Sequence, residues 1–204
     1  MSKFSEILCI EGLGFDSNSY LFDDILVDTG TGFNQNFLHD TLKKNNIDVD
    51  DISLIVNTHC HFDHVGGNYL FPNAKVAIGK YDAPILRDDY NRNTAVDLFS
   101  SKIKRHDVDI ELKENDKVGN FKVIHTPGHT PGGICLFDGE NLISGDTIFS
   151  NGGIGKMDLG GNFEDMKNTL MKLKKLDVKN LLPGHGPWTD NANEHIALSA
   201  SSLL

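Results

Sequence analysis

The chain contains few cysteines, no long hydrophobic run and no excess of basic residues. Its three cysteines, Cys9, Cys60 and Cys135, are odd in number and widely separated, so they indicate no disulfide framework and fit a reducing compartment. No apolar run approaches the roughly 20 residues that a membrane-spanning helix needs, and the first residues, Met1–Glu6, lack the apolar stretch of a signal peptide. We therefore expect a cytoplasmic protein with no membrane partner.

The charge balance is acidic, with 19 basic and 29 acidic residues and a formal net charge of −10. Proteins that bind nucleic acid displace counterions with a basic surface, so we expect no nucleic-acid partner. A length of 204 residues with 39% hydrophobic content is typical of one soluble domain, which we expect to span residues 1–204. The expected partner is a small-molecule substrate, and the sequence indicates no oligomeric state.

What the chain does have is a dense group of metal-binding side chains after the apolar run Ile52–Val56. The segment reads His59-Cys60-His61-Phe62-Asp63-His64. Imidazole nitrogens and carboxylate oxygens bind Zn²⁺ and Fe²⁺ at about 2.0–2.2 Å. His59 and His61 are two positions apart and can converge on one ion. Asp63 and His64, four and five positions after His59, can reach a second location. Cys60 alternates with the two flanking histidines, so we expect its thiol to point away from the metals.

Three further segments each place one such side chain beside a glycine, just after an apolar run. They are Gly128-His129, Gly145-Asp146 and Gly184-His185, which follow the runs Lys122–Ile124, Asn141–Ile143 and Asn180–Leu182. Glycine lets the backbone turn sharply, so that the neighbouring side chain projects from the strand end. Such a pattern is improbable by chance, and it predicts a metal site built from several strand ends.

This pattern resembles the metallo-β-lactamase superfamily over nearly the whole chain. The HxHxDH motif and the later ligand positions of that family are matched by His59, His61, Asp63 and His64, and by His129, Asp146 and His185. The resemblance implies an α/β fold, the αββα four-layer sandwich, with two mixed β-sheets face to face, helices outside and metals at one edge. We expect Val108–Leu112 to belong to the second sheet, with Phe121–Ile124, Ile134–Phe137 and Leu142–Ser144. Residues 80–105, with two helical fragments, are expected to face the substrate.

The resemblance also implies how the ligands are shared. The first metal would be held by His59, His61 and His129, the second by Asp63, His64 and His185, and Asp146 would bridge both. Two ions about 3.5–4 Å apart can share a water molecule and lower its pKa, which yields a bridging hydroxide; Asp63 would orient it. The expected cofactors are two Zn²⁺ ions or a zinc–iron mixture.

Asp28, in the segment Val27-Asp28-Thr29-Gly30, matches another motif of the family. A carboxylate at this position would fix the second ring nitrogen of a histidine ligand, which such ligands require. It would equally serve as a turn residue before Gly30. The sequence favours neither interpretation over the other.

Asp146 and residues 152–161 indicate the branch of the family. Broad-range β-lactamases with two zinc ions have cysteine at the position of Asp146, whereas a bridging carboxylate resembles glyoxalase II. Lys156 matches a lysine that contacts glutathione in glyoxalase II, but Asp158 stands where tyrosine would be and fits the persulfide dioxygenases better. We expect Lys156 to bind a carboxylate of the substrate, with an ordinary surface lysine as the alternative.

Together these features predict a glyoxalase II-like, metal-dependent hydrolase of a small thioester or ester. The alternative is a persulfide dioxygenase with a single Fe²⁺ held by His59, His129 and Asp146, a set of two histidines and one carboxylate that leaves positions open for oxygen.

Overall fold

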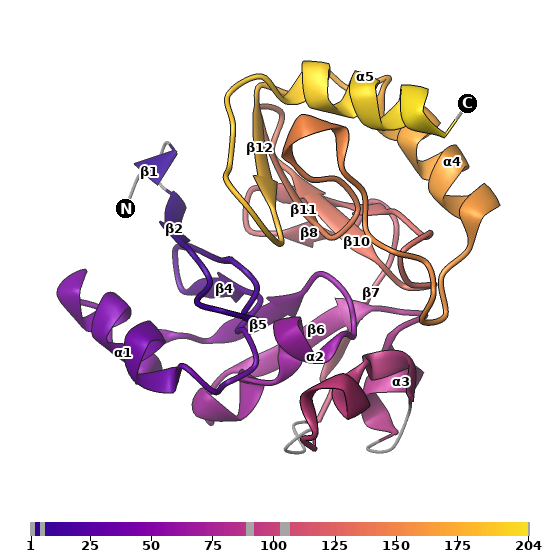
Figure 1. Ribbon diagram of the computed structural model, residues 1–204. Helices are drawn as coiled ribbons and strands as arrows, with labels where there is room; N and C mark the ends of the chain where they lie inside the picture. The colour runs from indigo at the N-terminus through magenta and orange to yellow at the C-terminus, as the bar shows by residue number, and fades with distance from the viewer. Residues whose placement is uncertain (1–2, 5–6, 89–91, 103–106, 204) are drawn as a thin grey trace.

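The strands of the protein, seen in a computed structural model that describes residues 3–4, 7–88, 92–102 and 107–203, form two sheets (Figure 1). The first sheet has seven strands in chain order. They are β1 (Lys3–Phe4), β2 (Ile7–Ile10), β3 (Ser19–Phe22), β4 (Ile25–Val27), β5 (Leu54–Asn57), β6 (Lys75–Gly79) and β7 (Ile110–Leu112). Pairing is antiparallel from β1 to β4 and parallel from β4 to β7, so the sheet is mixed.

The second sheet has five strands, and it is also mixed, because β11 and β12 are parallel while the other pairs are antiparallel. In spatial order they are β12 (Asn180–Pro183), β11 (Asn141–Gly145), β10 (Ile134–Phe137), β9 (Phe121–His125) and β8 (Lys117–Val118).

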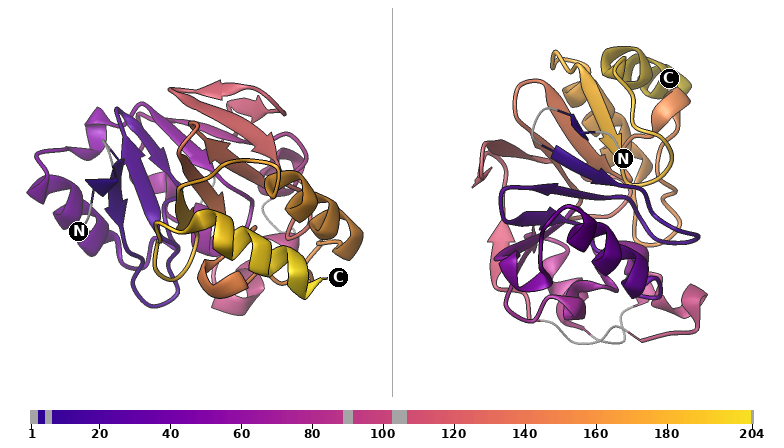
Figure 2. Two further views of the ribbon diagram at one scale, coloured as in Figure 1. Left: turned by 90° about the horizontal axis from the view of Figure 1, so that it is seen from above. Right: turned by 90° about the vertical axis from the view of Figure 1, so that its left-hand side faces the viewer.

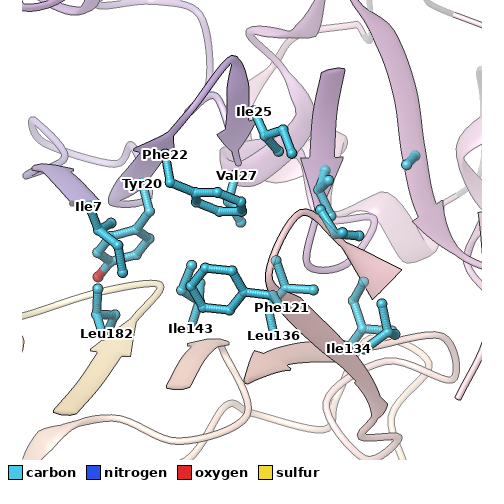
Figure 3. Packing of buried hydrophobic residues seen from close by; sticks show 14 of the residues in the cluster. Ile7, Tyr20, Phe22, Ile25, Val27, Phe121, Ile134, Leu136, Ile143 and Leu182 are labelled. Atoms are coloured by element: carbon cyan, nitrogen blue, oxygen red, sulfur yellow. The ribbon is translucent and has the colours of Figure 1, made fainter. Parts of the chain in front are cut away.

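The two sheets face each other across a hydrophobic core (Figure 3). Strand β3 shows how the chain divides its side chains: Tyr20 and Phe22 point into this core, whereas Leu21 between them packs on the outer face of the first sheet. This is the two-residue period of a strand that is buried on both faces. From the second sheet, Leu136 and Phe121 complete the layer, and the Phe22 and Phe121 rings lie 4.6 Å apart.

Helices cover the two outer faces, as Figures 1 and 2 show. The α-helices are α1 (Gln35–Lys44), α2 (Phe62–Val65), α3 (Ala83–Arg87), α4 (Phe163–Leu173) and α5 (Ala192–Ser202). Short 3₁₀ turns lie at η1 (Val49–Asp51), η2 (Asn68–Leu70), η3 (Arg92–Thr94), η4 (Val96–Phe99) and η5 (Ser150–Gly152). Helix α1 packs on the first sheet, and α4 and α5 pack on the second. None of the helices in the described ranges is long and apolar enough to cross a membrane.

Helix α4 illustrates why these segments are helical. The side chain of Asn162 caps its first turn by accepting a hydrogen bond from the backbone N–H of Asp165 at 3.0 Å. Met166, Leu170 and Leu173 recur at intervals of three and four residues and are buried against the second sheet. The apolar face thus directs the helix to the outside of the sandwich.

The fold class expected from the sequence is confirmed, but one strand assignment is wrong. The segment expected at Val108–Leu112 forms β7 in the first sheet, parallel to β6, with Ala77 opposite Ile110. The Asp109 carboxylate holds it there by accepting the backbone N–H of Val76 at 2.8 Å. A short apolar run shows that a strand is present but not which sheet it joins. Of residues 80–105, which are expected to face the substrate, 89–91 and 103–105 lie outside the described residues.

Replacing Leu136 with alanine tests the central core. Its side chain is 0% exposed between the sheets, and the cavity should lower the free energy of unfolding by about 2–5 kcal/mol. Urea denaturation measures this value. Leu198→Ala on α5, where the side chain is 51% exposed, is the matched control and should cost much less. Similar losses for both variants would contradict the packing described.

Candidate metal centre

The metal-competent side chains all emerge where strands end. Residues 58–64 follow β5, His129 lies in the loop after β9, and Asp146 and His185 follow β11 and β12. Because β5 is in the first sheet and the other three strands are in the second, the site lies at one edge of the sandwich, where loops from both sheets meet.

The structure brings together the seven side chains predicted to bind metal. Their ligand atoms form three groups, each with all atoms within 4.8 Å of one another. These groups are His59, His61 and His129; His59, His64 and Asp146; and Asp63, His64 and His185. Cys60 belongs to none of these groups, and its Sγ lies 3.8 Å from the carbonyl oxygen of Asn93.

Asp146 lies between the first and the last of these groups. Its Oδ2 is 3.7 Å from Nε2 of His129 and 3.7 Å from Nε2 of His185. Its Oδ1 is 3.2 Å from Nε2 of His64. One carboxylate therefore reaches both sides of the site, which is the arrangement that a bridging ligand requires.

Two histidines are held by one ring nitrogen so that the other is left for a ligand bond. Nδ1 of His64 lies 2.8 Å from the Asp28 carboxylate, and Nδ1 of His129 lies 2.5 Å from the backbone carbonyl of Lys156. Both partners only accept hydrogen bonds, so each Nδ1 carries the proton. Nε2 of His129 and Nε2 of His61 are buried without a hydrogen-bond partner. Such orphaned atoms are costly unless a cation binds them, so the residues fit a metal centre.

The electrostatic environment of the site also favours a cation. Burial disfavours the charged form of His64, but the carboxylates of Asp146, Asp28 and Asp63 outweigh it and hold its pKa well above the usual value. In contrast, burial, together with the neighbouring imidazoles, lowers the pKa of His61 to about 4. His61 is therefore neutral near pH 7 and able to donate its lone pair.

Asp28 has a left-handed backbone conformation, and its carboxylate contacts a predicted ligand. Its φ of 56° is in the left-handed region, which non-glycine residues rarely adopt. Its carboxylate accepts the backbone N–H of Thr58 at 2.8 Å and the Thr58 hydroxyl at 2.7 Å, in addition to contacting His64.

Lys156 contributes its backbone rather than its side chain to the contacts of the site. Its carbonyl holds His129, and its side chain is exposed.

Sequence reasoning did not identify this carbonyl, and it also missed Thr58, Phe149 and Asp82. The Phe149 ring lies 6.2 Å from the His185 ring. The Asp82 carboxylate accepts hydrogen bonds from the loops that carry His59, His61 and His129. Asp82 lies three residues after Gly79, the last residue of β6, whereas His129, Asp146 and His185 directly follow a glycine.

Comparison with known proteins agrees with this geometry. The sequence model of one protein family, the metallo-beta-lactamase superfamily, matches residues 12–185. The chain is similar to the probable metallo-hydrolase MJ0888 of Methanocaldococcus jannaschii, with 37% identity over 90% of this chain and 94% of the relative. It is 36% identical to a hydroxyacylglutathione hydrolase of Pelagibacter ubique over 72% of this chain and 56% of the relative. The fold is similar to the crystal structure of TTHA1623 in a di-iron-bound form, with a TM-score of 0.76 and 26% identity over 92% of this chain and 96% of that one.

Gly155→Ala should disrupt the site, because a Cβ there would lie 2.3 Å from the backbone oxygen of Asp146 and 2.6 Å from Nδ1 of His129. We expect the variant to bind less zinc per chain, measured by elemental analysis after dialysis. The control is Gly153→Ala, where the nearest atom is 3.3 Å away and φ is −69°. Equal zinc contents in the two variants would show that this close approach is unimportant.

Proposed function

The chain belongs to the metallo-β-lactamase superfamily, and we propose that it is a metal-dependent hydrolase of a small thioester or ester. The observation that carries the proposal is that Asp146 lies between the first and the last of the three metal-competent groups. In the last group, Asp63 and His185 have side-chain exposures of 18% and 35%. The remaining histidines of the groups are almost fully buried. A substrate would therefore approach from the side of Asp63 and His185.

Two divalent ions held by these groups would supply a nucleophile from water near neutral pH and would polarise the carbonyl group of the substrate. The chain's own contribution is positioning. Oδ2 of Asp63 lies 3.0 Å from Nε2 of His185. Asp63 is more solvent-accessible than Asp146, and we assign to it the role of orienting the attacking water and accepting its proton. A thiolate leaves without a strong acid, so a thioester needs no additional proton donor.

Aromatic side chains on segments that contact the opening of the site support a substrate with an apolar part. Phe149 contacts the His185 ring. Phe15 is 74% exposed. Its loop makes two backbone hydrogen bonds, from Ser17 N–H to the Asp63 carbonyl at 3.0 Å and from Asn18 N–H to the Gly184 carbonyl at 2.7 Å. The loop is thus attached to the residues at the opening of the site.

A dioxygenase with a single iron is the alternative, and one observation favours it. Asp146 lies in the same group as His59 and within 3.7 Å of His129, which also satisfies a two-histidine, one-carboxylate set. The occurrence of iron in a protein of similar fold, TTHA1623, supports a role for iron but in pairs. Oxygen uptake with a persulfide would distinguish this activity from hydrolysis.

Replacing Asp146 with asparagine or His61 with alanine should reduce thioester hydrolysis to the background rate, because each change removes a ligand atom from a group. Release of free thiol measures the activity, and circular dichroism shows whether the variants are folded. His39→Ala, on α1 and outside the three groups, is the control and should retain activity. Turnover by a folded Asp146 variant would refute the assignment.

Lys156→Ala tests the proposed binding of a substrate carboxylate. We expect KM for anionic thioesters to rise about two- to fivefold, the size of an exposed ion pair, with little change in kcat. KM for uncharged thioesters should not change. Lys174→Ala removes an exposed lysine just after α4 and is the matched control. If the alanine at 156 leaves KM unchanged for both substrate classes, Lys156 is an ordinary surface residue.

A further inference from the structure

Asp82 is a buried residue at the start of a helix, but its side-chain carboxylate does not bond to that helix. It is 0% exposed and lies at the N-cap of α3. An N-cap aspartate normally accepts a backbone N–H from the first turn of its own helix, but the Asp82 side chain makes no such bond. Its oxygens are directed instead to residues outside the helix.

The Asp82 carboxylate accepts three hydrogen bonds from two separate loops. Oδ2 accepts the backbone N–H of Cys60 at 3.0 Å and the hydroxyl of Thr130 at 2.7 Å, while Oδ1 accepts the backbone N–H of Gly132 at 2.6 Å. Cys60 lies between His59 and His61, and Thr130 directly follows His129. One side chain therefore connects both loops that carry the first metal-competent group.

The backbone around Asp82 allows this close approach only with glycine. A Cβ on Gly132 would lie 2.1 Å from the backbone nitrogen of Asp82, and a Cβ on Gly79 would lie 1.9 Å from the carbonyl oxygen of Gly132. Neither position could hold another residue without moving the backbone. The end of β6, the start of α3 and the His129 loop are thus packed backbone against backbone at the carboxylate.

Asp28 makes a similar set of contacts on the other side of the site. It accepts a backbone N–H and a hydroxyl, both from Thr58, and its third contact is Nδ1 of His64. Each of the two outer groups therefore has a buried carboxylate beside it, although Asp28 also reaches His59 of the first group through the Thr58 hydroxyl. Asp82 serves the group of His59, His61 and His129, whereas Asp28 contacts a member of the group of Asp63, His64 and His185.

We propose that Asp82 is a positioning residue that sets the separation of the His59–His61 turn from His129, and so governs the ion affinity of the first group alone. The proposal rests on the metal centre of the proposed function. Burial raises the pKa of the Asp82 carboxyl, and hydrogen bonds from Thr130, Gly132 and Cys60 oppose that rise. The three hydrogen bonds are between 2.6 and 3.0 Å long, which suits a group that fixes the distance between two loops.

Asp82→Asn should weaken this connection without changing the size of the side chain. An amide has one oxygen, so its NH₂ group would face either the Gly132 N–H or the donors of Cys60 and Thr130. At least one buried donor would lose its acceptor. Mutation of the groups that support metal ligands typically costs about 10–100-fold in metal affinity, and we expect a loss in this range at the first group.

The two outer groups can be examined separately in single-site backgrounds. His185→Ala removes a ligand of the last group only, and His61→Ala removes a ligand of the first group only. Zn²⁺ affinity is measured by competition with a chromophoric chelator. In the His185→Ala background, Asp82→Asn should weaken Zn²⁺ binding about 10–100-fold. In the His61→Ala background, the same change should have little effect.

Two further variants control for general loss of stability. Asp109→Asn disrupts a comparable bond from a backbone N–H to a carboxylate, at Val76, and should leave Zn²⁺ affinity unchanged in both backgrounds. If Asp82→Asn does not fold, Thr130→Val removes one of the three donors at nearly constant shape, and it should show the same selective effect with smaller size. Urea denaturation of the metal-free proteins measures the stability of each variant.

The possible results separate this inference from the proposed function. Selective weakening in the His185→Ala background supports the role of Asp82. Equal weakening in both backgrounds, or no weakening in either, overturns it even when the wild-type protein binds two ions. Failure of the wild-type protein to bind any Zn²⁺ or Fe²⁺ would instead refute the metal centre itself, and the role of Asp82 with it.

Discussion

The site depends on a hydrogen-bond partner for the second nitrogen of its buried imidazoles. A histidine can bind a metal ion in a defined direction only when the ring is oriented and its proton is on the other nitrogen. Asp28 does this for His64, and the Lys156 carbonyl does it for His129. The Thr58 hydroxyl lies 3.1 Å from Nδ1 of His59. These partners come from three different parts of the chain, so the ligand geometry requires the whole sandwich to be folded.

The sandwich meets this requirement because loops from both sheets end at one edge. The central core fixes the two sheets face to face, and the loops after β5, β9, β11 and β12 then deliver their side chains to the same place. Glycines at the closest approaches, such as Gly155 against Asp146 and His129, allow backbone to pass where a side chain would not fit. Packing far from the site therefore determines the separation of the metal-competent side chains.

Much of this arrangement could be predicted from the sequence, because ligand chemistry and strand ends leave local signals. The HxHxDH segment and the glycine-flanked His129, Asp146 and His185 lie together in the structure as the motif order implied. Interactions between distant segments were not predictable. The sheet to which β7 belongs depends on its pairing with β6. The role of the Lys156 carbonyl leaves no signal in the sequence, because every residue has a backbone carbonyl. Asp82 lies three residues after the glycine that ends β6, and no family motif pointed to it.

The account depends most directly on two ions binding at the groups joined by Asp146. Elemental analysis of protein purified without added metal or chelator measures the number and identity of the ions per chain. The account predicts about two ions of zinc, or of zinc and iron, per chain, the number that two groups joined by one carboxylate would hold. A single iron per chain would contradict it and favour the dioxygenase, and a chain that binds no transition metal would refute the site as a metal centre.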